Sequence, residues 1–474
     1  MGLRVGGRCA APLGRRVLAG ARGGRALAGA GGGRADADVA VVGAGAAGLT
    51  AALFAAAELG PAGRVVLLER EKEGGKKILM SGGSRCNVLP SSCSPDQDFF
   101  TGSSPKHLRN VLKSWSVDRC REWLAGDPSG TGLGLRLELE LESEKWFPAS
   151  DSAREVRDAL LAACERHGVE VLYRASVEGL ERQPAEGGGA GAWVCRGAAA
   201  AGVEVRAGAL VVASGGLSFP KVGTDGTGHR LLQGLGHSMH GPYPALTPLL
   251  GTHPGLESLA GVSHRVSVRF AHTPGPQKRG KKKKAPASFR PGFLFTHRGF
   301  SGPSVLDVSH HAVLALEAGE DPDLRVNWAP DLARADLEGL FQPAGDRTAL
   351  AALKTRLPSR LAKALMSESG VPHDRSLSEL RKAERLALVA AVSDYRLPCT
   401  GHAGYKVAEV TGGGVPLDEV DYRSLQSSVA PALFLCGEVL DCFGRIGGFN
   451  FLWAWTSGRL AGISAAKSVA ESRA

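Results

Sequence analysis

The sequence predicts an α/β protein with a parallel sheet, to which segments near both ends of the chain contribute. Three observations predict this fold. A short, mostly β-branched strand at 39–42 is followed at once by a glycine-rich turn and an alanine-rich helix over 49–59. A second apolar strand comes next at 65–68, as in a unit of two buried parallel strands joined by a helix. Near the other end, a strand at 433–438 precedes a Gly-Gly pair that opens a further helix.

Three glycines follow the first strand. Gly43, Gly45 and Gly48 have G-x-G-x-x-G spacing. The first allows a tight turn, the second lets a pyrophosphate approach the backbone, and the third lets helix and strand pack closely. Glu69 ends the second strand, 21 residues after Gly48, where its carboxylate can accept hydrogen bonds from a ribose diol. Strand, glycines, helix and acid together predict a dinucleotide-binding site, without distinguishing FAD from NAD.

The bulk composition limits the classes of protein that fit. A length of 474 residues predicts two or three domains. The formal net charge of +10 is concentrated in two segments, because residues 1–34 hold seven arginines and no acid, and residues 278–284 hold six lysines and arginines. The rest of the chain is close to neutral, which argues against a basic nucleic-acid-binding surface. No run of about 18 apolar residues occurs, so no membrane span is expected.

Residues 1–35 consist mainly of Gly, Ala, Arg and Leu. Spaced arginines without acids before Asp36 predict a cleaved organellar presequence, and the absence of Ser and Thr favours a mitochondrial over a plastid destination. The alternative is a disordered, low-complexity tail on a cytoplasmic protein. In either case we exclude this segment from the fold.

The remaining chain divides into three parts. Residues 36–240 form the first part of the dinucleotide-binding domain, with helices at 105–124 and 152–167 and a strand at 135–141. Strands at 169–173, 192–195 and 203–205 suggest a small antiparallel meander, and another buried strand starts at 210.

Residues 241–399 indicate an inserted unit, with β-structure followed by helices, and residues 400–474 return to the first domain. The helices are expected at 331–340, 348–357, 359–366 and 377–388. The lysine-rich run 278–284 is expected to be an exposed hairpin tip, with a nucleic-acid or nuclear-import patch as the alternative.

Nine cysteines without any C-x-x-C pair predict reduced, mostly buried thiols. Flavin disulfide reductases need a redox dithiol, and the nearest pairs here are Cys86 with Cys93 and Cys436 with Cys442. We expect both pairs to be structural.

Two further segments can hold a cofactor. Residues 71–87 contain two glycine pairs, three lysines and Arg85, and such a loop either wraps over phosphates or forms a solvated turn. Glu438 follows its strand, and the helix after Gly447-Gly448 begins a few residues later. An acid and a helix N-terminus in this order suit a flavin, because the acid can bind ribityl hydroxyls and the helix dipole stabilises negative charge on the reduced ring.

Seven motifs between residues 38 and 465 resemble one known family. They include V-V-G-A-G-A-A-G-L, G-K-K-I-L-M-S-G-G-S-R-C-N, W-F-P-A-S-D-S-A, A-S-G-G-L-S-F-P-K-V-G-T-D-G-T-G, L-F-T-H-R-G-F-S-G-P-S-V-L-D, V-A-E-V-T-G-G-G-V-P-L-D-E-V and the stretch from F-L-C-G-E-V-L-D to W-A-W-T-S-G-R-L-A-G. The chain resembles the BaiN/RdsA-type (YhiN-like) NAD(P)/FAD-dependent oxidoreductases of the two-dinucleotide-binding-domain flavoprotein superfamily.

The resemblance implies a Rossmann-like FAD-binding domain in split segments, with an inserted β-barrel-like plus helical domain. It also implies FAD contacts at Gly43, Gly45, Ala46, Ala47, Gly48, Glu69, Arg70, Ser81, Gly82, Arg85, Asn87, Val177, Ala213, Glu438, Gly448, Phe449 and Asn450. Two positions depart from the family pattern. Ser84 replaces a usual third glycine, and Ser214 stands where Thr is common. Both residues are small, so we expect FAD binding to be retained.

The resemblance implies an FAD-dependent oxidoreductase in which flavin N5 passes a hydride to an unsaturated or carbonyl substrate, with NADH or NADPH as the donor. The sequence contains no evident group of metal ligands and no evident nucleophile–base pair. His297 is a candidate acid, and a purely structural role for it is the alternative. No second strand–G-x-G-x-x-G–helix unit is evident. The alternatives are a flavin-dependent RNA-modifying or RNA-binding protein, suggested by the lysine run, and a non-catalytic scaffold stabilised by FAD. The sequence leaves the substrate and the oligomeric state open.

Overall fold

The structure is a computed structural model that describes residues 34–184, 191–197, 202–256, 258–271, 287–288, 292–343 and 346–473. The lysine run 278–284 and nearly all of the expected presequence lie outside the described residues, so both stay predictions. Strand β1 (Arg34–Val42) includes the last two residues of the segment that we expected to form a tail, and Arg34 pairs with Glu204.

Five parallel strands form the main sheet, and they come from distant parts of the chain. The order is β7 (Glu170–Tyr173), β2 (Val65–Glu69), β1 and β10 (Glu204–Val212), with β22 (Leu433–Leu435) beside β10. All four pairings between these strands are parallel. This arrangement confirms the predicted α/β class, in which helices cover a mostly parallel sheet of buried apolar strands.

The edge of strand β10 that faces away from β1 is shared between two partners. Its first half pairs antiparallel with β9 (Ala192–Gly197), which pairs with β8 (Val177–Gln183), while Leu210–Val212 pair with β22. The strands expected separately at 203–205 and from 210 are therefore one strand. The prediction that 169–173 belongs to the antiparallel meander is wrong, because helix α6 (Ala153–Arg166) carries the chain across the sheet and delivers β7 parallel to β2.

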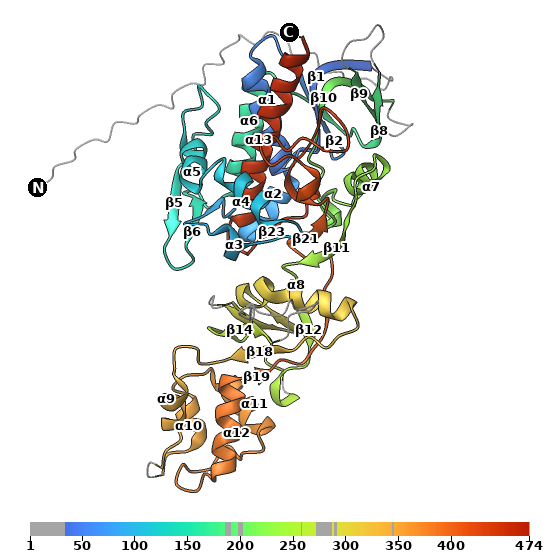
Figure 1. Cartoon of the computed structure of the whole chain (residues 1–474). Helices are drawn as coiled ribbons and strands as arrows, with labels where there is room; N and C mark the ends of the chain where they lie inside the picture. The colour runs from blue at the N-terminus through green and yellow to red at the C-terminus, as the bar shows by residue number, and fades with distance from the viewer. Residues whose placement is uncertain are drawn as a thin grey trace, which may run out of the picture.

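Helices α1 (Ala46–Leu59) and α13 (Phe449–Arg473) lie side by side against the sheet, next to α6 (Figure 1). Two glycines permit their close approach. A Cβ at Gly458 would lie 2.4 Å from the carbonyl oxygen of Ala47, and one at Gly462 would lie 2.2 Å from that of Ala51. The last helix of the chain thus completes the first unit of the fold.

Smaller elements lie on the same part of the molecule. They are α2 (Lys76–Met80), β3 (Leu89–Pro90), α3 (Pro95–Asp98), β4 (Phe99–Phe100), α4 (Pro105–Lys113), α5 (Val117–Ala125), β5 (Leu137–Glu140), β6 (Lys145–Pro148), α7 (Thr227–Gly234) and β23 (Phe443–Gly444). The helix expected over 105–124 is two helices, because the Ser116 side chain accepts a hydrogen bond from the Arg119 N–H and caps a new start.

A two-stranded ribbon, β11 (His240–Ala245) with β21 (Val410–Gly414), leads to and from the inserted region. The insertion contains two small antiparallel sheets with helix α8 (Pro303–Glu317) beside them. Below these sheets, four further helices lie farthest from the main sheet (Figure 1). The sheets are β13 (Ser263–His264), β16 (Phe293–Thr296), β17 (Gly299–Ser301), β12 (Leu249–Gly251) and β20 (Cys399–His402), then β15 (Ala287–Ser288), β14 (Ser267–Phe270), β18 (Leu324–Asn327) and β19 (Tyr395–Arg396). The helices are α9 (Arg334–Gly339), α10 (Ala349–Leu353), α11 (Ser359–Glu368) and α12 (Lys382–Ser393).

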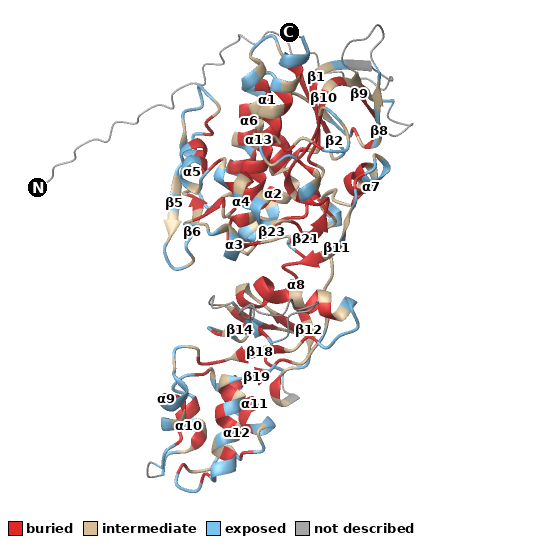
Figure 2. Cartoon of the chain, in the orientation of Figure 1, coloured by how far each residue is buried: buried red, intermediate tan, exposed pale blue. Residues whose placement is uncertain are grey.

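Buried apolar residues gather in two large clusters and one small one (Figure 2). The first cluster fills the space between the main sheet and its helices, and the second fills the insertion around Trp328. The small cluster, with Leu246, Leu306, Val410 and Phe443, lies where the ribbon meets both. Among the described helices, none is both long and apolar enough to cross a membrane.

Candidate functional site

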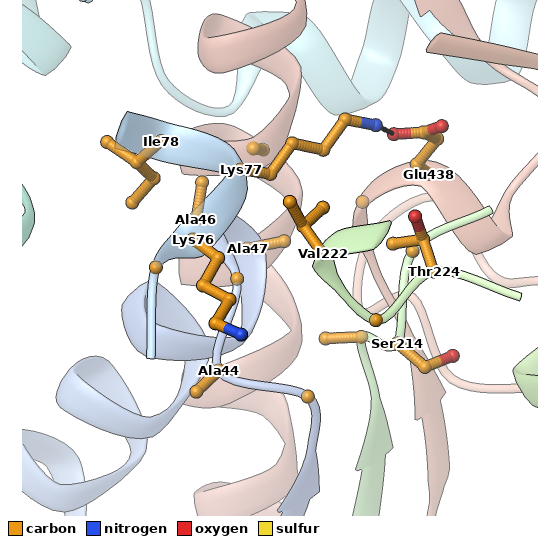
Figure 3. Close-up of a pocket in the computed structure, with 18 of the residues that line it drawn as sticks. Ala44, Ala46, Ala47, Lys76, Lys77, Ile78, Ser214, Val222, Thr224 and Glu438 are labelled. Atoms are coloured by element: carbon orange, nitrogen blue, oxygen red, sulfur yellow. Dashed lines mark hydrogen bonds and ion pairs between the residues drawn. The ribbon is translucent and has the colours of Figure 1, made fainter. Parts of the chain in front are cut away.

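A pocket opens at the carboxyl ends of the parallel strands β1, β2 and β10, where ligands of open α/β sheets bind. It encloses about 1900 Å³ of space, part of it open to solvent. It extends from the end of β2 past the glycine turn and α2 to the start of α13. Figure 3 shows Ala44, Ala46 and Ala47 on one side of the pocket, with Ser214 and Thr224 on the other.

The three glycines of the turn occupy three different environments. Gly43 has φ +100°, in a region that favours glycine, and a Cβ there would lie 2.7 Å from the carbonyl oxygen of Ala213. A Cβ on Gly48 would lie 1.8 Å from the carbonyl oxygen of Gly43, so helix and strand are in direct contact. A Cβ on Gly45 would meet no protein atom within 4 Å, and Gly45 lines the pocket. The geometry is compatible with the role that the spacing predicts for each glycine, and the approach of a pyrophosphate to Gly45 stays a prediction.

The N-terminus of α1 faces this open space. Gly45 is the N-cap residue, and among the described residues no side chain accepts a hydrogen bond from the first N–H groups of the helix. These donors and the positive end of the helix dipole are suited to bind an anion. A pyrophosphate needs free N–H donors and a backbone without a side chain in its way. The start of α1 and Gly45 provide both, so this part of the structure fits a dinucleotide.

Glu69 is held in a fixed orientation at the end of β2. Its two carboxylate oxygens accept hydrogen bonds from the backbone N–H groups of Ala44, at 2.7 Å, and Glu71, at 2.8 Å. Each oxygen has a further lone pair, so the carboxylate can also accept bonds from ribose hydroxyls. Beside it, Arg70 forms an ion pair with Asp225 at 2.9 Å and donates to the carbonyl oxygen of Gly223.

The opposite end of the pocket carries a charged pair. Lys77 reaches across to Glu438, with 2.5 Å between Nζ and Oε2, as Figure 3 shows. The other Glu438 oxygen accepts the Thr411 N–H at 2.8 Å, which ties the acid to β21. The start of α13 lies alongside, because Gly448 and Asn450 also line this end. An acid, a lysine and a helix N-terminus therefore meet where a flavin ring would lie.

Fourteen of the seventeen residues predicted to contact FAD line this one pocket. The fourteen are Gly43, Gly45, Ala46, Ala47, Glu69, Arg70, Ser81, Gly82, Asn87, Val177, Ala213, Glu438, Gly448 and Asn450. The contact of each residue with FAD stays a prediction. The structure shows that segments as far apart in sequence as Gly43 and Asn450, 407 residues, line one pocket.

Gly48, Arg85 and Phe449 do not line the pocket. Gly48 packs against the turn, and Phe449 is buried against Phe99. Arg85 lies 4.1 Å above the ring of Phe147 and donates to Asp151 at 2.8 Å and to Glu140 at 3.0 Å. Both acids raise the pKa of Arg85 by hydrogen bonding. Its guanidinium is therefore already neutralised outside the pocket.

Several pocket residues were not singled out from the sequence. Five of them are charged, namely Glu73, Lys76, Lys77, Asp225 and Glu409. Lys77 and Glu409 both lie inside motifs that carry the family resemblance. The sequence signal that could have identified Glu409 is an acid inside the otherwise mostly apolar run V-A-E-V-T. Ser214 also lines the pocket, and its buried hydroxyl has no hydrogen-bond partner among the described residues. His297 lies in an exposed turn after β16 and does not line the pocket.

The eight described cysteines are free thiols, mostly buried. Burial raises the pKa of Cys86 and Cys164 to about 12, and that of Cys442, which lines the pocket, well above its usual value. A thiol that stays protonated is a poor nucleophile. Cysteine chemistry therefore does not explain this site.

Fold and site together define a Rossmann-type flavoprotein with FAD as its cofactor. A family model described as the HI0933-like protein Rossmann domain matches residues 37–464. The chain belongs to this family, and it is an FAD-dependent oxidoreductase. This membership confirms the resemblance drawn from the sequence motifs.

Two curated relatives match the chain over most of their length. A ribosomal RNA dihydrouridine synthase of Escherichia coli (strain K12) is 31% identical over 428 residues, which is 89% of this chain and 96% of that protein. A 3-dehydro-bile acid delta(4,6)-reductase of Clostridium scindens is 30% identical over 434 residues, which is 90% of this chain and 99% of that protein. Among solved structures, a 3-ketosteroid-delta4-(5alpha)-dehydrogenase from Rhodococcus jostii RHA1 is 17% identical with a TM-score of 0.46, over 91% of this chain and 97% of that one.

Proposed function

We propose that this protein is a reductase that takes electrons from NADH or NADPH through FAD and reduces a carbon–carbon double bond conjugated with a carbonyl group in a small molecule. The observation that carries this proposal is the shared chemistry of two relatives. Dihydrouridine is uridine whose C5–C6 double bond, conjugated with a carbonyl, has been reduced. A delta(4,6)-reductase of a 3-dehydro bile acid acts on double bonds conjugated with the 3-carbonyl. The chain is about equally similar to both relatives, at 31% and 30% identity, so similarity does not favour the substrate of one over that of the other. We therefore infer only the type of bond that the two substrates share.

The chain's own residues have separable tasks in such a reaction. The uncapped N-terminus of α1 and the bare backbone of Gly45 would bind the pyrophosphate, and Glu69 would orient a ribose. Glu438, Lys77 and the start of α13 would hold the flavin end. Bound FAD supplies hydride transfer at N5, and the protein supplies its position and electrostatic surroundings.

The position of α13 suits a cofactor that passes through a reduced, negatively charged form. The N-terminus of a helix carries a partial positive charge, and α13 begins beside the Glu438 end of the pocket. A positive potential there stabilises negative charge on a flavin that has accepted electrons. Since no second dinucleotide-binding unit is evident in the sequence, we infer that the nicotinamide donor binds transiently at the open side of the same pocket.

The test is anaerobic spectroscopy of the purified full-length chain. Oxidised flavin gives absorption bands at about 375 and about 450 nm. We expect NADH or NADPH to bleach these bands, and a 3-oxo-4,6-diene bile acid to restore them. Restoration by a uridine-containing ribosomal RNA fragment alone would favour the RNA-modifying alternative. Bands that neither nicotinamide bleaches would favour the scaffold, and protein that cannot be loaded with FAD would refute the proposal.

A further inference from the structure

Glu409 is a pocket residue for which FAD binding gives no explanation. It immediately precedes β21, and its N–H donates to the carbonyl oxygen of Leu246 at 3.2 Å. None of the seventeen residues implied to contact FAD lies between Ala213 and Glu438. The wall formed by Glu409 and Val410 therefore comes from the ribbon that leads to the insertion, not from the cofactor-binding segments.

The backbone fixes the position of Glu409 near the flavin end. Two residues later, the Thr411 N–H donates to Glu438, which also pairs with Lys77. Val410 pairs with Ala245 across the ribbon and belongs to the small apolar cluster. The acid is thus placed by β21, between the Glu438 end of the pocket and the insertion.

The Glu409 carboxylate has neither a hydrogen bond nor an ion pair among the described residues. Its side chain lines the pocket and is exposed. Desolvation by the atoms packed near it raises the pKa of Glu409, with Asp307 acting in the same direction and Lys145 and Lys77 opposing. Displacement of pocket water by a cofactor and substrate removes further solvation from the charged form. A raised pKa favours the protonated carboxyl group, which is the form that a general acid needs.

We propose that Glu409 is the general acid that completes the reduction. This inference rests on the proposed function. Hydride adds to the substrate carbon farther from the carbonyl, the electron pair of the double bond moves toward the carbonyl, and the proton of the Glu409 carboxyl group is transferred to the carbon next to the carbonyl. The product has gained one hydride and one proton, and the carboxylate recovers its proton from water. The electrons come from NADH or NADPH through FAD, as the proposed function requires.

The experiment compares Glu409→Gln and Glu409→Asp with wild type and with Glu165→Gln, a matched control on the exposed side of α6. The two half-reactions are followed separately by stopped-flow absorbance, with the 3-oxo-4,6-diene bile acid and the uridine-containing RNA fragment as probes. We expect Glu409→Gln to retain flavin and its bleaching rate within about twofold. Its reoxidation by the probe should slow by about 10²- to 10⁴-fold, with Glu409→Asp intermediate.

A second measurement needs no turnover. Infrared spectra at neutral pH should show a protonated carboxyl band in wild type and Glu165→Gln that is missing in Glu409→Gln. Absence of this band in wild type, or reoxidation of Glu409→Gln at the wild-type rate, would overturn the inference while the proposed function stands. Wild type that is not bleached, or that no probe reoxidises, would instead refute the proposed function, and the inference with it.

Discussion

Replacing Gly45 or Gly48 with alanine separates binding of the cofactor from stability of the fold, although both glycines belong to one short motif. At Gly48 the added methyl group would lie 1.8 Å from the carbonyl oxygen of Gly43. That distance is about half of an ordinary contact, so α1 must move away from β1. We expect the free energy of unfolding to fall by about 3 kcal/mol or more.

At Gly45 the same methyl group meets no protein atom within 4 Å, and φ of −79° is open to alanine. Loss of a glycine at a helix N-cap costs at most about 1 kcal/mol. The methyl group projects into the pocket instead, where the pyrophosphate would approach. We expect FAD affinity to fall about 10- to 100-fold, which is about 1.4 to 2.8 kcal/mol.

Urea denaturation of the flavin-free proteins measures stability, and fluorescence titration with FAD measures affinity. Gly234→Ala is a suitable control, because its added methyl group also meets no atom within 4 Å and Gly234 does not line the pocket. Wild-type FAD affinity in Gly45→Ala would refute the placement of the pyrophosphate. A loss of stability in Gly45→Ala equal to that in Gly48→Ala would refute the distinction between the two sites.

Three further predictions concern the frame around the pocket. Ser84→Gly should stabilise the protein by about 1 kcal/mol in urea denaturation, because Ser84 has φ +72° and glycine adopts this conformation without strain. His311→Asn should reduce the loss of stability on acidification. Burial lowers the pKa of His311 to about 4, so on acidification the unfolded chain binds this proton before the folded protein does. In wild type, but not in the variant, this histidine should reduce the free energy of unfolding by up to about 3 kcal/mol as the pH falls from about 6.5 to about 4. The exposed His297→Asn should keep the wild-type profile, and equal slopes in all three proteins would contradict the assignment. Arg445→Met should lower the free energy of unfolding by about 3 kcal/mol, because it removes the guanidinium that Asp307, at 3.3 Å, and Asp98, at 3.4 Å, share. An unchanged urea midpoint would show that these ion pairs do not hold the insertion against the flavin domain.

The sequence predicted those features that local patterns encode. The first strand, the glycine turn and Glu69 are local, and each lies where it was expected. The pairing of β7 is not local: its apolar pattern fits either an antiparallel meander or a parallel edge strand, and only the crossover of α6 decides. Strand pairing depends on the path of the whole chain, which a window of residues does not contain.

The same distinction applies to the pocket. Arg85 has the composition expected of a phosphate ligand, but Glu140 and Asp151, 55 and 66 residues away in sequence, hold its guanidinium elsewhere. Glu409 reaches the pocket only because the ribbon places β21 next to Glu438. Ser84 was interpreted as a harmless exchange of small residues, whereas its positive φ explains why glycine is usual there. Residue type predicts which chemistry is available, and backbone geometry decides which residues take part.

The close packing of α13 on α1 has a consequence for how the protein is made. Domains generally fold as units during synthesis, starting from the N-terminus. Here about 400 residues of chain separate the nucleotide turn from β22 and α13, which complete its sheet and its helical layer. During synthesis the surface of α1 therefore stays uncovered until α13 has been translated. Newly made protein should acquire FAD only after α13 has emerged from the ribosome, and a stop codon that removes α13 should yield chains that never retain it.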